Sequence, residues 1–315
     1  MSRPTVLMPV RLHDSAVDGC EERFELLRLW EAPDPDALLA ERGADVRGLA
    51  GGAHRRIDAA LFDRLPNLEI VANFGVGYDS IDVDAATERG IVVTNTPGVL
   101  DDEVADTALA LLLMTVRELG QAEQYLRTGR WASEGHYPLT DLTMTGLKLG
   151  ILGLGRIGEA IARRAETFRM TVGYHNRTLK DVPYRYYPSL LEMARDVDTL
   201  VIVVPGNAAT HHLVDAEVLA ALGPDGVLVN VGRGTVVDEA ALVDALKTRT
   251  IRAAGLDVFE DEPNVPRELI DLDNAVLLPH VGSATTPTRR AMGQLLVDNL
   301  TSWFADGRAL SPVNG

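Results

Sequence analysis

The chain has 315 residues, 46% of them hydrophobic, which is enough for packed cores in two domains of ordinary size. Its 30 basic and 46 acidic residues give a net charge of −16, so we expect neither nucleic acid nor a membrane surface as partner. Cys20 is the only cysteine, which excludes an internal disulfide and favours a cytoplasmic location. Residues 1–10 predict a strand rather than a signal peptide, and the longest apolar run, 108–116, is too short to span a membrane.

The first hundred residues alternate between short apolar segments and segments that open with an acidic residue. The apolar segments predict strands at Thr5–Val10, Phe24–Leu29, Val46–Ala50, Ile70–Phe74 and Ile91–Thr94. The others predict helices at Asp34–Arg42, Asp58–Leu65 and Asp82–Arg89. This alternation indicates a parallel sheet with helices on both faces.

A single long helix is predicted from Asp101 to Thr128, followed by a second α/β series. Its strands are expected at Leu147–Leu152, Thr171–Tyr174, Thr199–Val204, Gly226–Val231, Ile251–Asp257 and Ala275–Leu278. Helices are expected at Ile157–Phe168 and, near the end of the chain, at Pro287–Phe304. Six strands with helices between them make a complete doubly wound dinucleotide-binding domain.

These patterns predict an α/β protein with two doubly wound parallel sheets. The second series is self-contained, so the last helix can return to the first domain. We therefore expect a cofactor domain at residues 100–286, inserted into a substrate domain formed by residues 1–99 and 287–315, with the site in the cleft between them.

A glycine-rich turn, Gly153-Leu-Gly155-Arg-Ile-Gly158, joins the first strand of the second series to its helix. In a dinucleotide-binding turn the first glycine permits the tight bend, the second lets the backbone approach the pyrophosphate, and the third lets the helix pack on the strand. The helix N-terminus supplies unpaired amides for the phosphates. The strand-turn-helix context favours a dinucleotide site over an ordinary turn.

The end of the next strand distinguishes NADPH from NADH. An NAD site usually places an acid there to bind the ribose hydroxyls. This chain has His175-Asn176-Arg177-Thr178 instead, with no acid before Asp181. Arg177 can pair with a 2′-phosphate, helped by Asn176 and Thr178, so we expect NADPH to be preferred.

Three polar residues of the second half each lie in or just after a loop at the end of a predicted strand: Arg233, Glu262 and His280. Ligands of open α/β sheets bind at such loops. A guanidinium can bind a carboxylate through two hydrogen bonds, and a carboxylate beside an imidazole favours the imidazolium, an acid usable near neutral pH. Glu260 and Asp261 are rival partners for His280.

No metal site is expected. His211 and His212 follow Thr210, a candidate helix N-cap, and neighbouring residues of a helix do not share a ligand face. The other candidate histidines without ligand-like spacing are His13, His54 and His136.

With these residues in view, the chain resembles the D-isomer-specific 2-hydroxyacid dehydrogenases, and among them the NADPH-preferring glyoxylate/hydroxypyruvate reductases. The resemblance covers nearly the whole chain. Besides the glycine-rich turn, it rests on Asn73-Phe-Gly-Val-Gly-Tyr-Asp79, Asn95-Thr-Pro-Gly98, Val104-Ala-Asp-Thr107, Asn230-Val-Gly-Arg-Gly234, Gly255-Leu-Asp-Val-Phe-Glu260 and Pro279-His-Val-Gly-Ser283.

The resemblance implies a flavodoxin-like substrate domain, a Rossmann cofactor domain and a homodimer with Asp101–Thr128 near the interface. It makes His280 the acid–base group with Glu262, rather than its neighbours, as partner, and it makes Arg233 the substrate anchor. The implied substrate-binding residues are Leu49, Gly51, Val76, Gly77, Arg233 and Ser283. The implied cofactor-binding residues are Val76, Thr107, Gly153, Leu154, Gly155, Arg156, Ile157, Gly158, Asn176, Arg177, Thr178, Val204, Pro205, Thr210, Val231, Gly232, Arg233, Asp257, His280 and Gly282.

The expected activity is NADPH-dependent reduction of small 2-keto acids, glyoxylate or hydroxypyruvate, to D-2-hydroxy acids. Two alternatives remain. Small residues in the segment 46–53 leave room for bulkier 2-keto acids such as phenylpyruvate. The second alternative is a dinucleotide-sensing scaffold similar to the C-terminal-binding corepressors. Those proteins carry extended termini that are not seen in this sequence, so we favour an enzyme.

Overall fold

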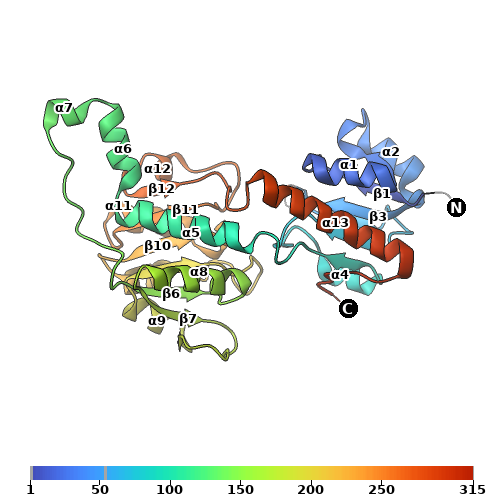
Figure 1. Cartoon of the computed structure of the whole chain (residues 1–315). Coiled ribbons are helices and arrows are strands. Elements are labelled where there is room, and N and C mark those ends of the chain that lie inside the picture. Colours follow the sequence, from blue (N-terminus) through green and yellow to red (C-terminus); the bar gives the residue numbers. More distant parts are fainter. Residues whose placement is uncertain (1–2, 53–54, 315) are drawn as a thin grey trace. The chain divides into compact units, whose positions relative to one another are not determined.

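The computed structural model describes residues 3–52 and 55–314 (Figure 1). Their contacts form two compact units, Met1–Leu100 with Ala284–Gly315, and Asp101–Ser283, which we call unit 1 and unit 2. Each unit is an open sheet of parallel strands, as the sequence predicts. In the described part of the chain, no helix combines the length and the apolarity that crossing a membrane requires.

Unit 1 contains a five-stranded sheet in the order β2-β1-β3-β4-β5, the flavodoxin-like order. The strands are β1 Thr5–Met8, β2 Glu25–Arg28, β3 Val46–Gly51, β4 Ile70–Asn73 and β5 Val92–Thr94. The α-helices are α1 Asp14–Arg23, α2 Pro35–Arg42, α3 Ala59–Phe62, α4 Val83–Glu88 and α13 Thr286–Asp306.

The central strands of unit 1 are apolar on both faces, because helices cover both. Successive strand residues point to opposite sides. Val6 of β1 packs in a cluster with residues of α1 and α13, whereas its neighbour Leu7 packs in a separate cluster with residues of α2, α3 and α4. The return of α13 to unit 1 explains why the two units are not simply consecutive along the chain.

Unit 2 contains a seven-stranded parallel sheet in the order β12-β11-β10-β9-β6-β7-β8. Its strands are β6 Lys148–Leu152, β7 Thr171–His175, β8 Arg185–Tyr186, β9 Thr199–Ile202, β10 Val227–Asn230, β11 Ala253–Leu256 and β12 Ala275–Leu277. Its α-helices are α5 Asp101–Val116, α6 Leu119–Arg127, α7 Arg130–Glu134, α8 Arg156–Thr167, α9 Leu190–Asp196, α10 Ala216–Leu222, α11 Glu239–Lys247 and α12 Arg267–Ile270.

The strand order of unit 2 is that of a Rossmann sheet. From β6 the chain first adds β7 and β8 on one side of the sheet, and then returns to add β9 to β12 on the other side of β6. Because all strands are parallel, the loops after them meet at one edge. That edge carries the glycine-rich turn after β6, Arg233 after β10, Asp257 after β11 and His280 after β12. The fold therefore places the chemically interesting residues of unit 2 on one side of one sheet.

The structure differs from the predicted elements in several places. The segment 101–128 is not one helix: Glu118 has a left-handed φ of 50° and separates α5 from α6. The residues His211 and His212 lie in a turn and not on a helix. Helix α3 is shorter than predicted, and α1 and the two-residue edge strand β8 were not expected. These elements are short, or polar enough that tertiary packing rather than local pattern defines them.

Candidate active site

The glycine-rich turn has the geometry of a dinucleotide cradle. Gly153 adopts a φ of 102°, which L side chains rarely adopt. A Cβ atom on Gly158 would lie 2.4 Å from the carbonyl oxygen of Gly153, so this glycine lets α8 pack closely on the turn. A Cβ on Gly155 would meet no atom within 4 Å, which leaves its backbone open to a ligand. These are the three roles that a pyrophosphate-binding turn requires.

The first amides of α8 remain available for an anion. Gly155 caps the helix, and the first amide bonded back to the cap is that of Glu159, at 2.8 Å from the oxygen of Gly155. The amides of Arg156 and Ile157 therefore have no intrahelical acceptor. Leu154 is placed differently from its neighbours, because its side chain is buried and its amide donates to Oδ1 of Asn176 at 2.7 Å.

Asn176 therefore braces the turn through its Oδ1, and its contact with a 2′-phosphate stays a prediction. Its side-chain amide also lies 3.4 Å from the carbonyl oxygen of Leu154. Arg177 and Thr178 are exposed just beyond β7, and Arg177 makes no ion pair or hydrogen bond with the described residues. Two of the three residues expected at the 2′-phosphate thus remain accessible to it.

Arg233 is positioned by the buried residue Asn230 at the end of β10. The Asn230 amide nitrogen donates to the carbonyl oxygen of Arg233 at 2.9 Å, and its Oδ1 accepts the amide of Gly232 at 3.0 Å. Arg233 donates through Nη1 to the carbonyl oxygen of Gly232 at 2.8 Å. This role of Asn230 was not predicted, although an Asn before Val-Gly at the end of a strand is a signal for such a turn.

The predicted pair of His280 and Glu262 forms. The distance between Nδ1 of His280 and Oε2 of Glu262 is 2.7 Å, and both side chains are about one-third exposed, at 38% and 32%. Oε1 of Glu262 accepts the amide of Phe259 at 3.1 Å. Burial raises the pKa of Glu262, but the hydrogen bond and charge of His280, the Phe259 amide and the charge of Arg233 outweigh it, so the net pKa is lowered.

Asp257 holds the backbone on which His280 lies. Its two carboxylate oxygens accept the amides of Val281 at 2.7 Å and Gly282 at 2.8 Å, and its carbonyl oxygen accepts the amide of His280 at 2.9 Å. Burial raises the pKa of Asp257, and the two amide donors oppose that shift. The resemblance implies that Asp257 contacts the nicotinamide, and in this structure its carboxylate accepts hydrogen bonds from the loop that carries His280.

Other cofactor residues implied by the resemblance lie at the same edge of unit 2. Val204 contacts the glycine-rich turn, since a Cβ on Gly153 would lie 2.6 Å from it. The Thr210 hydroxyl donates to the Pro205 carbonyl at 2.7 Å and so closes the loop after β9. Val231 is buried after β10, and the Thr107 hydroxyl donates to the Gly282 carbonyl at 3.4 Å. Ser283, which the resemblance implies to bind substrate, is half-buried.

In unit 1, the loop after β4 presents unpaired amides. Asn73 donates to the carbonyl oxygens of Gly75 at 3.0 Å and Gly77 at 2.8 Å, and Asn95 donates to that of Val76 at 2.9 Å. Among the described residues, the amides of Val76 and Gly77 have no acceptor. Successive free amides on a clamped loop form a concavity suited to an anion.

The implied substrate contact of Leu49 is not supported by its position. Leu49 lies within β3, is fully buried and packs in the core of unit 1, because alternate residues of this strand face a helix layer. Gly51 ends the same strand and is buried against Ile57. The rest of the segment proposed to admit bulkier substrates includes Ala53, which, like His54, lies outside the described residues.

Comparison with known proteins assigns the site to a family. The model of the "D-isomer specific 2-hydroxyacid dehydrogenase, NAD binding domain" matches residues 109–282, more than half of the chain. The chain is 54% identical to the NADPH-dependent glyoxylate/hydroxypyruvate reductase of Sinorhizobium meliloti, solved with NADP and malonate, with a TM-score of 0.94 over 99% of this chain and 97% of that one.

Two curated relatives match over 98% of both chains. They are glyoxylate/hydroxypyruvate reductase A HPR2 of Arabidopsis thaliana, at 47% identity, and hydroxyphenylpyruvate reductase of Plectranthus scutellarioides, at 45%. The Rossmann strand order, the cradle at the end of β6 and the His280–Glu262 pair agree with these matches. The chain belongs to the D-isomer-specific 2-hydroxyacid dehydrogenase family.

Proposed function

We propose that this protein is an NADPH-dependent reductase that converts small 2-keto acids, glyoxylate or hydroxypyruvate, to D-2-hydroxy acids. The observation that carries the proposal is the hydrogen bond of 2.7 Å between His280 and Glu262 at the sheet edge that also carries Arg233 and the glycine cradle. The names of the relatives from Sinorhizobium meliloti and Arabidopsis thaliana support the same activity.

The residues at this edge fit NADPH. The open backbone at Gly155 and the free amides of α8 would hold the pyrophosphate, and Arg177 would pair with the 2′-phosphate. No carboxylate stands between the end of β7 and Asp181 to repel that phosphate. When bound, the cofactor supplies a hydride to the carbonyl carbon of the substrate.

His280 completes the reduction by giving a proton to the carbonyl oxygen. Glu262 occupies Nδ1, which leaves Nε2 as the ring atom that faces the substrate. The carboxylate keeps the ring oriented and favours the imidazolium until the proton leaves. Arg233 would bind the substrate carboxylate and stabilise the charge that develops on the oxygen. In unit 1, the free amides of Val76 and Gly77 are proposed to bind an anion.

The substrate class rests on the relatives as well as on the site. Hydroxyphenylpyruvate reductase from Plectranthus scutellarioides is almost as similar as the Arabidopsis thaliana protein, at 45% against 47% identity. A bulkier 2-keto acid is therefore the second candidate. It is less well supported, because the more similar relatives carry the names of glyoxylate and hydroxypyruvate reductases.

A direct assay tests the proposal. Purified protein is mixed with NADPH or NADH and with glyoxylate, hydroxypyruvate, pyruvate, phenylpyruvate or hydroxyphenylpyruvate, and the loss of reduced-nicotinamide absorbance is followed. The expected result is turnover that favours NADPH over NADH, and glyoxylate and hydroxypyruvate over the other acids. Binding of NADPH without turnover of any acid would instead favour a dinucleotide-sensing scaffold.

We also propose a homodimer that uses the segment from α6 to Leu139. Four of the exposed large hydrophobic residues lie there, including Trp131 at 57% and Leu139 at 96% exposure. Exposed apolar residues clustered on one segment are typical of an interaction surface. In Figure 1, α6 and α7 extend away from the sheet of unit 2.

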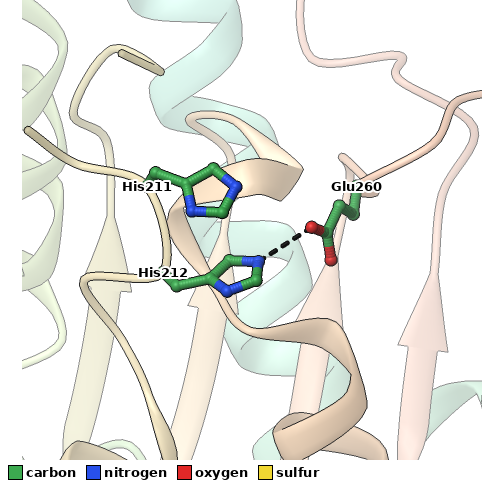
Figure 2. A group of neighbouring side chains, drawn as sticks. All are labelled: His211, His212 and Glu260. Carbon is green, nitrogen blue, oxygen red and sulfur yellow. Dashed lines mark hydrogen bonds and ion pairs between the residues drawn. The ribbon is translucent and has the colours of Figure 1, made fainter. Parts of the chain in front are cut away.

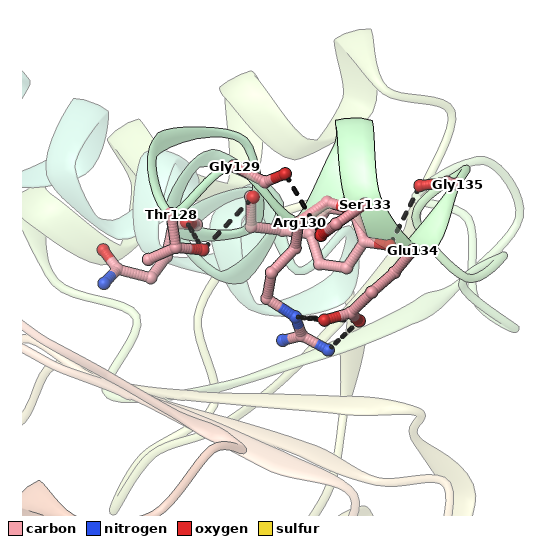
Figure 3. Close-up of polar contacts among 8 residues, drawn as sticks. Thr128, Gly129, Arg130, Ser133, Glu134 and Gly135 are labelled. Atoms are coloured by element: carbon pink, nitrogen blue, oxygen red, sulfur yellow. Dashed lines mark hydrogen bonds and ion pairs between the residues drawn. The ribbon is translucent and has the colours of Figure 1, made fainter.

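The corner between α6 and α7 holds this surface in shape. Arg130 makes a two-pronged ion pair with Glu134 and lies 4.6 Å from the centre of the Tyr125 ring, whose hydroxyl donates to Gly135 (Figure 3). Light scattering after gel filtration should show a dimer, and Trp131→Glu should yield monomers. Leu179→Glu, a change at a leucine that is 70% exposed outside this segment, should not. A monomeric parent protein would refute this part of the proposal.

The cytoplasmic location is proposed on the evidence of the single cysteine. Cys20 is buried in α1, and burial raises its pKa to about 12, so it is a poor thiolate nucleophile and a poor partner for disulfide formation.

A further inference from the structure

A second histidine–carboxylate cluster lies in unit 2, formed by His211, His212 and Glu260 (Figure 2). One ligand atom from each residue lies within 4.8 Å of the other two. Nε2 of His212 is 2.8 Å from Oε1 of Glu260, and the two imidazole rings stack with their centres 3.9 Å apart. On a helix, these adjacent histidines would point in different directions. The chain instead forms a turn here, and the two rings lie on the same side of it.

The backbone holds both halves of the cluster against the segment Gly234–Thr235. The amide of His212 donates to the carbonyl oxygen of Thr235 at 2.9 Å. Gly234 lies so close to the chain at Phe259 that a Cβ atom would stand 1.8 Å from the Phe259 carbonyl carbon. Because Gly234 has no side chain, Phe259 and Glu260 can lie beside the same segment that binds His212. The backbone positions of His212 and Glu260 are therefore set by packing.

We propose that His211, His212 and Glu260 bind a divalent transition-metal ion of the Zn²⁺ class. Two imidazoles and one carboxylate are a ligand set that zinc accepts, and three protein ligands leave a further position for water. Zinc bonds of about 2.0–2.2 Å place tetrahedral ligand atoms about 3.4 Å apart. The 2.8 Å separation of His212 and Glu260 would have to open by about 0.6 Å, and the other separations, which are at most 4.8 Å, would have to close by about 1.4 Å or less.

A carboxylate lies near the second ring nitrogen of His212. Nδ1 is 4.0 Å from Oδ2 of Asp238, too far for a hydrogen bond, so a small approach of the two side chains would be needed. Histidines that bind metals are commonly oriented by a carboxylate at the other ring nitrogen. In the metal-bound form, the ion would replace the proton shared by Nε2 of His212 and Glu260, and that proton would pass to solvent.

This site is separate from the proposed catalytic pair but linked to it through the chain. Glu260 lies two residues before Glu262, and Gly234 follows Arg233 directly. A bound ion would join the segment that carries Glu262 to the turn at His211–His212, which is hydrogen-bonded to Thr235, two residues after Arg233. The inference goes beyond the reductase activity and does not depend on it, since metal binding can be measured without turnover.

The experiment is a titration of tag-free protein with Zn²⁺ in competition with a chromophoric zinc indicator. The parent protein should bind one ion per chain at this site. His211→Ala and Glu260→Gln should each weaken binding by more than about tenfold, because losing even an outer partner of a metal ligand costs about 10- to 100-fold. His211 is exposed, so His211→Ala should fold normally.

Two control variants locate the ion. His136→Ala removes an exposed histidine outside the cluster, and His280→Ala removes the other histidine paired with a glutamate; both should bind Zn²⁺ like the parent. Saturating Zn²⁺ should also raise the melting temperature of the parent by several degrees and that of His211→Ala by less. The proposal is overturned if the parent binds no zinc, or if His211→Ala and Glu260→Gln bind it as tightly as the parent.

Discussion

Nδ1 of His280 lies 2.7 Å from Oε2 of Glu262, while the other oxygen of that carboxylate accepts the amide of Phe259 at 3.1 Å. Glu262 is thus held from both sides and in turn holds the imidazole. The ring cannot turn without breaking a charge-assisted hydrogen bond. Only Nε2 is left to exchange a proton with a substrate.

Replacing Glu262 by Gln should change the pH dependence of the reaction. The lowered pKa of Glu262 means that this carboxylate stays charged as pH falls through the ordinary range of glutamate. A neutral amide cannot stabilise the positive charge of a protonated ring as the carboxylate does. Reduction, which needs a proton from His280, should therefore lose relative to oxidation of the 2-hydroxy acid, and more so as pH rises.

The measurement is kcat/KM for both directions across the pH range, for the parent and Glu262→Gln. Asp261→Asn, a neighbouring exposed acid, serves as the control and should follow the parent. Superimposable profiles for the parent and Glu262→Gln would mean that Glu262 does not govern the protonation of His280.

Replacing Arg177 by Ala should weaken NADPH and spare NADH. Arg177 is exposed at the end of β7 and is proposed to pair with the 2′-phosphate, which NADH lacks. Losing a hydrogen-bonded pair with a charged group costs about 1.5–3 kcal/mol, so KM for NADPH should rise roughly 10- to 100-fold. Steady-state kinetics with both cofactors check this, and an equal rise for the two would place the 2′-phosphate elsewhere.

Two glycines of the cradle should respond differently to Ala. Gly155 has a φ of −90° and open space around its missing Cβ, so Gly155→Ala should change unfolding stability by no more than about 0.5 kcal/mol. It should still weaken NADPH strongly, because its methyl group would stand where the backbone approaches the pyrophosphate. Gly158→Ala, with its Cβ 2.4 Å from the oxygen of Gly153, should lose both binding and about 1–3 kcal/mol of stability.

Thermal melts and NADPH titrations of the two variants separate these effects. If Gly155→Ala lowered the melting temperature as much as Gly158→Ala, the open space at Gly155 would not be the reason for its effect on cofactor binding.

Replacing Asp257 by Asn should loosen the loop that carries His280. An amide group can accept only one of the N–H groups of Val281 and Gly282 and presents a donor to the other. One buried N–H then lacks a partner, which costs about 1–3 kcal/mol. We expect a melting temperature lower by several degrees and a lower kcat with all substrates. A variant with the parent's stability and kcat would show that the loop does not need this carboxylate.

Much of this protein can be read from its sequence, because the signals are local. Strands buried on both faces appear in the sequence as continuous apolar runs. The glycine-rich turn is recognisable because its backbone conformation and its close packing require glycine at fixed positions. The parallel sheet then brings strand ends such as those before Arg233 and His280 to one edge. The fold class and the family follow from these features together.

Only the tertiary structure decided which side chains pair. From sequence, Glu260, Asp261 and Glu262 were equivalent neighbours apart from a family resemblance, yet Glu262 bonds to His280 and Glu260 to His212. The sequence did not predict that Asn176 braces the cradle, or that Leu49, expected to contact substrate, lies in the core. A side chain's partner depends on where distant loops meet, and loop positions are set by packing between elements rather than by local propensity.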